Sequence, residues 1–234
     1  MLWIRSTVFL VGMVLSAILF SPIAIFSGLL PALVCTRVIS LWALFINFWL
    51  RVTCKIVYKV RGELDWGNGP AVILSKHQSA WETIAFQLIF PTQTWALKRE
   101  VLWIPFFGWG LAATRPIAIN RRAKVRALDQ LIEQGTQRLQ EGRWVVIFPE
   151  GTRMAPGLRG HYSPGGAMLA INCNVPIIPV AHNAGSFWGR RQFLKRPGTI
   201  QVWVGPAINT TDRKPRALIK EAEDWIEEKM KVLN

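Results

Sequence analysis

The first fifty residues of the chain form two uncharged, apolar runs. Residues 6–36 carry no charged side chain, and a second uncharged run covers residues 38–50. About twenty apolar residues in a helix cross the hydrocarbon core of a bilayer, so the first run is long enough, although Pro22 and Pro31 interrupt it. The second run is too short to span and suits an interfacial or partly inserted helix. We expect residues 1–52 to form membrane-anchoring helices, either as one true span or, as we favour, as a helical hairpin that dips into one leaflet.

Beyond residue 62, short apolar runs alternate with segments of helical periodicity, which is typical of an α/β domain. We assign residues 53–234 to this domain. The apolar runs predict buried strands over residues 71–74, 144–148, 175–181 and 199–204. The periodic segments predict helices over residues 79–90, 123–141, 165–172 and 215–233. Because proline cannot donate a hydrogen bond to a sheet, Pro176 and Pro179 predict an edge position or an irregular course for strand 175–181.

Composition adds a basic, tryptophan-rich character to this picture. Lys and Arg number 28 against 14 Asp and Glu, which gives a formal net charge of +14, and the chain has 12 Trp. Cationic side chains bind the phosphates of an anionic membrane surface, and indole rings favour its headgroup level. The basic residues Arg51, Lys55, Lys59 and Arg61 directly follow the apolar runs and predict that the rest of the chain lies on the cytoplasmic side. The sequence lacks a zinc-finger spacing, an aromatic RNA-binding signature and a basic zipper, so nucleic acid is not an expected partner.

His77 stands five residues before Glu82, just after the strand predicted over residues 71–74. A histidine exchanges protons near neutral pH, and a carboxylate on its far nitrogen fixes the tautomer and stabilises the imidazolium. His77 is therefore a candidate general base. Ser79-x-x-Glu82 is equally a helix-capping box, in which Glu82 reaches back to the cap amide. Positions five apart on a helix point about 140° apart, so His77 can meet Glu82 only from the loop before the helix. This segment alone leaves both interpretations open.

A second candidate loop, residues 149–153, follows the strand predicted over residues 144–148. Arg153 can bind a phosphate through two hydrogen bonds, Gly151 lets backbone amides approach it, and Thr152 adds a hydroxyl donor. Open α/β sheets place ligands at the carboxyl ends of their strands, so this loop and His77 could face one cleft.

Four cations lie in sequence between the two loops, namely Lys98, Arg99, Arg121 and Arg122, and together they indicate an anionic substrate. Most single surface cations are merely solvated. Arg121 and Arg153 are the strongest candidates because each adjoins the end of a predicted element, and Lys98 is next.

Other catalytic schemes fit the sequence less well. It contains neither a G-x-S-x-G elbow nor a phosphate-binding G-x-x-x-x-G-K-[ST] loop. His161 and His182 could line the same cleft, although each is more typical of a hydrogen-bonded surface or core histidine. The three cysteines are far apart and predict neither a disulfide nor a zinc site.

The combination resembles the glycerolipid acyltransferases, over roughly residues 55–210. Four motifs in order carry the resemblance: His77-Gln78-Ser79-Ala80-Trp81-Glu82, Ile119-Asn120-Arg121, Phe148-Pro149-Glu150-Gly151-Thr152-Arg153 and Val175-Pro176-Ile177-Ile178-Pro179-Val180. The resemblance implies an α/β fold with a mixed sheet flanked by helices, like that of the glycerol-3-phosphate acyltransferases, preceded by the membrane-embedded hairpin or span. It also implies a membrane location, expected to be a bacterial inner membrane with the catalytic domain on the cytoplasmic side.

The resemblance further implies a reaction and a set of site residues. His77, oriented by Glu82, would take a proton from the free hydroxyl of 1-acyl-sn-glycerol-3-phosphate (lysophosphatidate), which attacks an acyl thioester and gives phosphatidic acid. The acceptor's phosphate would be held by the cations Lys98, Arg121 and Arg153. Its glycerol site would be shaped by Glu150, Gly151 and Thr152. The acyl donor would be an acyl carrier protein or coenzyme A thioester as co-substrate, and no cofactor or metal is expected.

Three departures from the family pattern bear on the acceptor. Glu82 replaces the usual Asp, Asn120 stands where an acidic residue often precedes the arginine, and Lys76 stands where Asn commonly precedes the histidine. A lyso-ornithine lipid or a lysophospholipid therefore remains an alternative acceptor. An alternative of another class is a catalytically silent membrane protein that holds anionic lipid in its basic cleft.

Overall fold

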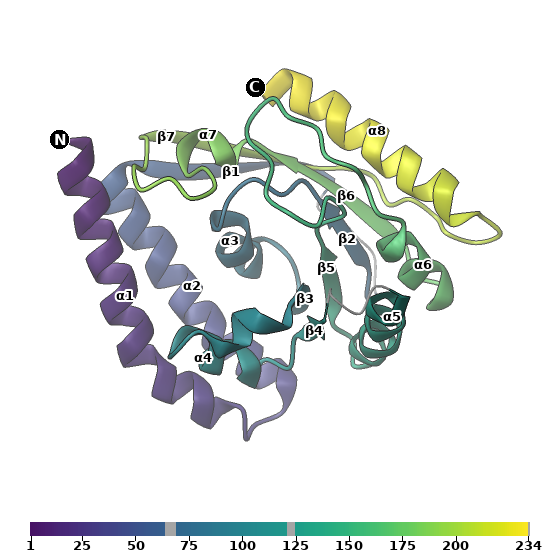
Figure 1. Cartoon of the computed structure of the whole chain (residues 1–234), viewed down its shortest axis with the longest axis horizontal. Coiled ribbons are helices and arrows are strands. Elements are labelled where there is room, and N and C mark those ends of the chain that lie inside the picture. The colour runs from purple at the N-terminus through teal and green to yellow at the C-terminus, as the bar shows by residue number, and fades with distance from the viewer. Residues whose placement is uncertain (64–68, 121–124, 234) are drawn as a thin grey trace.

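A seven-stranded mixed sheet forms the centre of the described chain, with the order β1-β7-β6-β2-β5-β3-β4 (Figure 1). The computed structural model describes residues 1–63, 69–120 and 125–233. The strands are β1 (Ile56–Gly62), β2 (Val72–Ser75), β3 (Gln93–Lys98), β4 (Ile117–Ile119), β5 (Trp144–Ile147), β6 (Ile177–His182) and β7 (Gly198–Val204). Neighbouring strands run parallel except β6 and β7, which are antiparallel. The predicted α/β class with a mixed sheet is confirmed.

Helices cover both faces of this sheet. They are α1 (Leu2–Ser27), α2 (Ala32–Cys54), α3 (Trp81–Ile89), the 3₁₀ helix η1 (Arg99–Trp103), α4 (Phe107–Ala113), α5 (Val125–Gln140), α6 (Gly165–Asn172), α7 (Ala184–Phe187) and α8 (Pro215–Leu233). Successive strand side chains point to opposite faces. Accordingly, Ile73 joins the core formed with α2 and α3, whereas Val72 and Leu74 join the core formed with α5, α6 and α8. Because both faces are buried, β2 is apolar without alternation, as predicted for residues 71–74.

The two apolar N-terminal helices form an antiparallel hairpin (Figure 1). Both are long and apolar enough to cross a membrane. The helix break falls between Gly28 and Pro31, while Pro22 lies inside α1. The prediction that the second apolar helix is only a short run over residues 38–50 is wrong. That helix begins at Ala32, because the charged side chain of Arg37 points outward and does not interrupt it.

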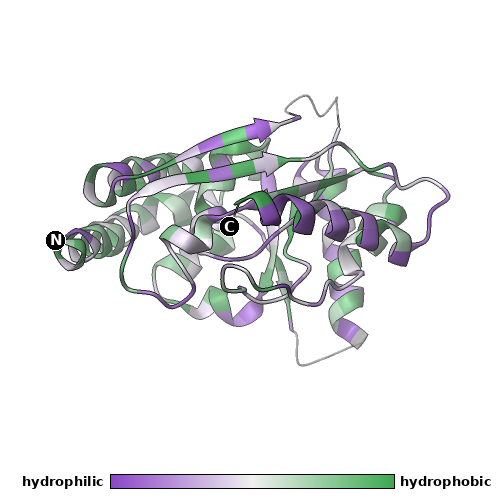
Figure 2. Cartoon of the chain, turned by 90° about the horizontal axis from the view of Figure 1, so that it is seen from above, coloured by the Kyte–Doolittle hydropathy of each residue, from purple (hydrophilic) through white to green (hydrophobic). Residues whose placement is uncertain are grey.

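The hairpin is attached to the α/β domain along its whole length. Near its start, Ser6 Oγ accepts the Lys195 N–H at 2.9 Å. Near its turn, Ser21 Oγ donates to the Phe106 carbonyl at 3.1 Å. Its outer face is apolar and exposed, whereas α8 on the far side of the sheet is largely hydrophilic (Figure 2). Because both ends of the hairpin are fixed to the domain, the structure favours the predicted hairpin that dips into one leaflet over a single helix that spans the membrane.

The prediction of an edge position for the strand with two prolines is wrong, since β6 lies between β2 and β7. Pro176 precedes the strand, where its carbonyl accepts the Val72 N–H at 3.0 Å. Pro179 has its carbonyl on the β7 side, where it accepts the Gly205 N–H at 2.9 Å. The β6–β7 ladder begins only at Val180, so the missing N–H of Pro179 removes no ladder bond.

Candidate active site

The two candidate loops emerge side by side. β2 and β5 are adjacent and parallel, with Val72 opposite Val145, so their carboxyl ends lie side by side at the same end of the sheet. β2 leads into the His77 loop and β5 into residues 149–153. The prediction that both loops face one cleft is confirmed: His77 and Arg153 line the same cavity.

His77 and Glu82 meet as a dyad. His77 Nδ1 lies 2.8 Å from Glu82 Oε1, and the same oxygen accepts the backbone N–H groups of Gln78 at 3.0 Å and Ser79 at 2.8 Å. Ser79 Oγ in turn accepts the Trp81 N–H at 3.0 Å. α3 begins at Trp81, two residues later than predicted, which leaves His77 in the loop as the dyad requires. Glu82 thus accepts both the Ser79 N–H at the helix start and the imidazole, whereas the Ser79 hydroxyl accepts the Trp81 N–H and not the Glu82 N–H that a full capping box requires. The catalytic role of the pair stays a prediction.

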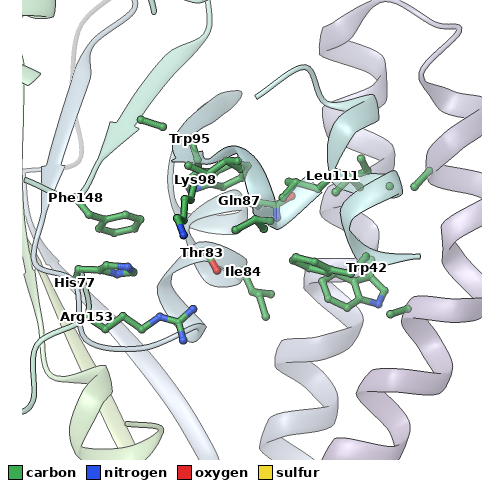
Figure 3. Close-up of a pocket in the computed structure, with 18 of the residues that line it drawn as sticks. Trp42, His77, Thr83, Ile84, Gln87, Trp95, Lys98, Leu111, Phe148 and Arg153 are labelled. Atoms are coloured by element: carbon green, nitrogen blue, oxygen red, sulfur yellow. The ribbon is translucent and has the colours of Figure 1, made fainter. Parts of the chain in front are cut away.

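The carboxyl group of Glu82 is fully buried and ionised. Burial by itself raises its pKa, but the positive charge that His182 and His77 carry when protonated at acid pH, together with the hydrogen bonds from His77 and the Ser79 N–H, outweighs that effect and holds the pKa below its usual value. An ionised Glu82 accepts the proton of His77 Nδ1, so the tautomer with a lone pair on Nε2 is favoured. The ring stacks on Phe148 with centroids 4.0 Å apart, and Figure 3 shows it facing the cavity opposite Thr83 and Lys98.

His182 lies behind the dyad as a buried, neutral histidine. Burial lowers its pKa, which favours the uncharged ring. The Ala184 N–H points at His182 Nδ1 at 3.3 Å, so Nε2 carries the proton and donates to the Lys76 carbonyl at 2.8 Å. This bond fixes the peptide group that precedes His77. His161 is exposed, and neither histidine lines the cavity.

Glu150 supports the His77 loop from the side away from the cavity. Its Oε2 accepts the His77 N–H at 3.1 Å, and its Oε1 accepts Lys76 Nζ at 2.8 Å. Lys76 is only 1% exposed and also bonds Glu227 Oε1 on α8 at 2.8 Å. Tyr162 donates its hydroxyl to that same carboxylate oxygen at 2.9 Å. A buried cation thus joins the first and third motifs to the C-terminal helix, in the position where the family pattern commonly has Asn.

A cavity of about 390 Å³ extends from His77 toward the hairpin (Figure 3). Its polar end is lined by His77, Lys98, Gly151, Thr152 and Arg153. Its apolar end is lined by residues of α1, α2 and α4, among them Phe20, Ile39, Trp42 and Leu111. A base and cations at one end and hydrocarbon at the other suit an amphipathic substrate with an anionic head.

The structure brings most of the predicted site residues together. Lys98, Gly151, Thr152 and Arg153 line the cavity with His77. Gly151 has a positive φ of 66°, the left-handed conformation that glycine tolerates best. Glu82 lies behind the histidine, where its predicted role of orienting His77 places it. Glu150, predicted to shape the glycerol site, instead binds the His77 backbone from behind and does not line the cavity. Arg121 falls outside the described residues. Within the described ranges, no three His, Cys, Asp or Glu side chains are placed to hold a metal ion.

Sequence reasoning missed two cations in this cavity. Arg190 and Arg191 lie in the loop between α7 and β7 and line the cavity beside Arg153. A signal was present in the sequence, because this loop follows the strand predicted over residues 175–181, as the other two candidate loops follow theirs. Glu227 was also missed, because the helix pattern marks it only as one acid on a polar face.

Comparisons with known proteins agree with this geometry. A family model described as Acyltransferase matches residues 52–183. A 1-acyl-sn-glycerol-3-phosphate acyltransferase from Pseudomonas aeruginosa is 43% identical over 232 residues, which cover 97% of this chain and 90% of that protein. The human 1-acyl-sn-glycerol-3-phosphate acyltransferase beta is 31% identical over 144 residues, which cover 61% of this chain and 52% of that protein. The crystal structure of the 1-acyl-sn-glycerophosphate acyltransferase from Thermotoga maritima superposes with a TM-score of 0.81 at 19% identity, covering 98% and 95% of the two chains, and at that identity the likeness concerns the fold.

Proposed function

This chain belongs to the Acyltransferase family, and on that basis we propose that it transfers a fatty acyl group from an acyl thioester to the free hydroxyl of 1-acyl-sn-glycerol-3-phosphate, giving phosphatidic acid. The observation that carries the proposal is the His77–Glu82 dyad, 2.8 Å between Nδ1 and Oε1, at the polar end of a cavity whose other end is apolar. The dyad supplies a base, and the cavity suits a lipid.

The reaction follows from the protonation states at this dyad. His77 Nε2 takes the proton of the acceptor hydroxyl, and the oxygen of that hydroxyl attacks the thioester carbonyl. Glu82 stabilises the imidazolium that forms. The tetrahedral intermediate then collapses, the carbon–sulfur bond breaks, and the thiolate leaves as a thiol with the proton from His77. General-base help of this kind contributes roughly 10²- to 10⁴-fold, and the alignment of the two substrates contributes further.

The cations at the polar end of the cavity hold the phosphate of the acceptor. Lys98 and Arg153 supply charge on either side of the cleft, and the second-motif Arg121 joins them by its resemblance to the family pattern. Arginine forms two parallel hydrogen bonds with a phosphate, which fixes the headgroup as well as attracting it. Gly151 and Thr152 then lie beside the glycerol backbone, and Glu150 keeps the His77 loop in place beneath it.

The acyl chains occupy the apolar end of the cavity, next to the membrane. The hairpin exposes apolar side chains on its outer face, and the segment from η1 to α4 continues that surface with Trp103 and Trp109, which are 64% and 48% exposed. Such a surface suits the bilayer interface. We place the domain on the cytoplasmic face of a bacterial inner membrane, where the basic residues after the hairpin favour that side. The donor is the thioester of acyl carrier protein or of coenzyme A.

The test is a matrix of donors and acceptors with the purified full-length protein in detergent or vesicles. Thiol release and phosphatidic acid should appear with lysophosphatidate and at least one of the two donors, and should be lost in His77→Ala. Acylation confined to a lyso-ornithine lipid or a lysophospholipid would change the acceptor. Binding of anionic lipid without thiol release, unaltered in His77→Ala, would contradict the enzyme assignment.

A further inference from the structure

Cations lie on both sides of His77, in the loops that follow the carboxyl ends of the strands on either side of β2. β6 is the neighbour of β2, and the chain leaves its carboxyl end through α7 into the loop that carries Arg190 and Arg191. On the other side of β2, β5 leads to Arg153. Arg190 Nη1 donates to the Arg153 carbonyl at 3.2 Å, so the two loops touch. Arg153, Arg190 and Arg191 therefore all line this cavity, and Arg190 contacts the backbone of the Arg153 loop.

The loop with Arg190 and Arg191 is anchored rather than free. The Lys195 N–H donates to Ser6 Oγ at 2.9 Å, and the Lys195 ammonium lies over the Phe9 ring of α1, 5.9 Å from its centroid. The Phe193 ring lies against Trp3, with centroids 4.9 Å apart. These contacts join the loop to α1, so the hairpin itself fixes where the two arginines stand.

The three arginines have no acidic partner among the described residues. The ion pairs of the described chain do not include Arg153, Arg190 or Arg191. Like charges that line one cavity repel one another, and the repulsion is relieved when an anion binds among them. A dianion relieves more of it than a monoanion does, because each added negative charge interacts with all three cations.

We propose that Arg190 and Arg191 are specificity-determining residues that select a dianionic phosphate monoester as acceptor over a monoanionic phosphodiester. The inference rests on the proposed function and deepens it. Lysophosphatidate carries a phosphate monoester with a second ionisation near pH 6, so it is mostly dianionic at pH 7. A lysophospholipid with an esterified headgroup carries one charge on its phosphate. The cluster of Arg153, Arg190 and Arg191 binds the dianion and discriminates against the diester.

The experiment measures inhibition of lysophosphatidate acylation by dodecyl phosphate and by its methyl ester, two non-reactive lipids that differ by one negative charge. The wild type should bind the monoester about tenfold more tightly than the methyl ester, as expected for one additional charge-assisted hydrogen bond. In Arg190→Gln/Arg191→Gln this preference should fall to about twofold or less. Arg196→Gln is the matched control, an exposed cation on the same loop that does not line the cavity.

Three outcomes would overturn the inference. One is a wild type that binds both inhibitors equally. Another is a double variant that loses affinity for both inhibitors by the same factor. The third is a double variant that raises only the KM of the thioester donor, which would assign the two arginines to the donor. Failure of the proposed function would give a different result, because wild-type protein would then release no thiol with lysophosphatidate. In that case the affinities of the two inhibitors would be measured by direct binding, with the same preference of about tenfold expected for the monoester.

Discussion

Glu150 accepts the backbone N–H of His77 at 3.1 Å, so the third sequence motif holds the first from behind. The other oxygen of this carboxylate is held by Lys76, which is bound in turn to Glu227 on α8. The position of the catalytic histidine therefore depends on a buried ion cluster that extends to the C-terminal helix.

Removing the cation of this cluster should destabilise the fold. In Lys76→Met, Glu150 and Glu227 lose their shared partner, and an uncompensated buried charge costs about 3–5 kcal/mol of unfolding free energy. Denaturant unfolding in detergent measures the change. Lys220→Met, which removes an exposed pair with Asp224, is the matched control and should change stability by less than about 1 kcal/mol. A loss as small as that of the control would show that the cluster is not needed.

Stability should fall as the pH falls below about 6.5, because of His182. Its folded-state pKa is lowered by burial, so the unfolded chain takes up this proton first and the unfolding free energy decreases toward acid. One such proton gives a slope of at most about 1.4 kcal/mol per pH unit. His182→Gln, which has no charge to gain, should have a flatter profile between pH 6.5 and the folded-state pKa. Glu82 acts in a separate, lower window, since its depressed pKa stabilises the fold above 4.5 and that contribution is lost as the pH falls through the folded-state value.

The apolar end of the cavity should set the preferred acyl chain length. Leu111 lines it from α4, and Leu111→Phe adds volume there. The variant should prefer shorter acyl chains, with kcat/KM for the longest donors reduced about tenfold relative to the shortest, because overpacking typically costs 1–3 kcal/mol. A series of acyl thioesters of increasing chain length measures the profile. Leu44→Phe, an exposed hairpin position outside the cavity, should leave the profile unchanged.

The aromatic surface between η1 and α4 should enter the membrane interface with the hairpin. An environment-sensitive dye on Trp103→Cys, in a background where Cys173 is Ser and the buried Cys35 and Cys54 remain, should shift to the blue when vesicles are added. Nitroxide-bearing lipids should quench it. The same dye on Val232→Cys, an exposed apolar position on α8, should not respond. Equal spectra at the two positions would show that the segment stays in water.

The sequence predicted those parts of the site whose partners are close along the chain. His77 and Glu82 lie within six residues, and the strand before them and the helix after them determine where each can point. The Lys76–Glu227 pair spans 151 residues, and no local pattern distinguishes Glu227 from the other acids of α8. The edge position predicted for the proline-containing strand was wrong because the missing N–H of Pro179 lies just before the β6–β7 ladder begins at Val180, where no ladder bond is lost. Whether a strand lies at the edge or in the middle of the sheet depends on the order of the strands, and the periodicity of a single sequence does not reveal that order.

The most direct test of the dyad is the turnover of Glu82→Gln, measured as thiol release with lysophosphatidate and an acyl thioester beside thermal unfolding of the same sample. A glutamine oxygen can still accept the Gln78, Ser79 and His77 Nδ1 hydrogen bonds, so the fold and the tautomer should survive. Only the negative charge that stabilises the imidazolium is lost. We predict a loss of turnover of roughly 10²-fold or more with an unfolding temperature within a few degrees of wild type. Wild-type turnover in a folded Glu82→Gln protein would contradict the dyad.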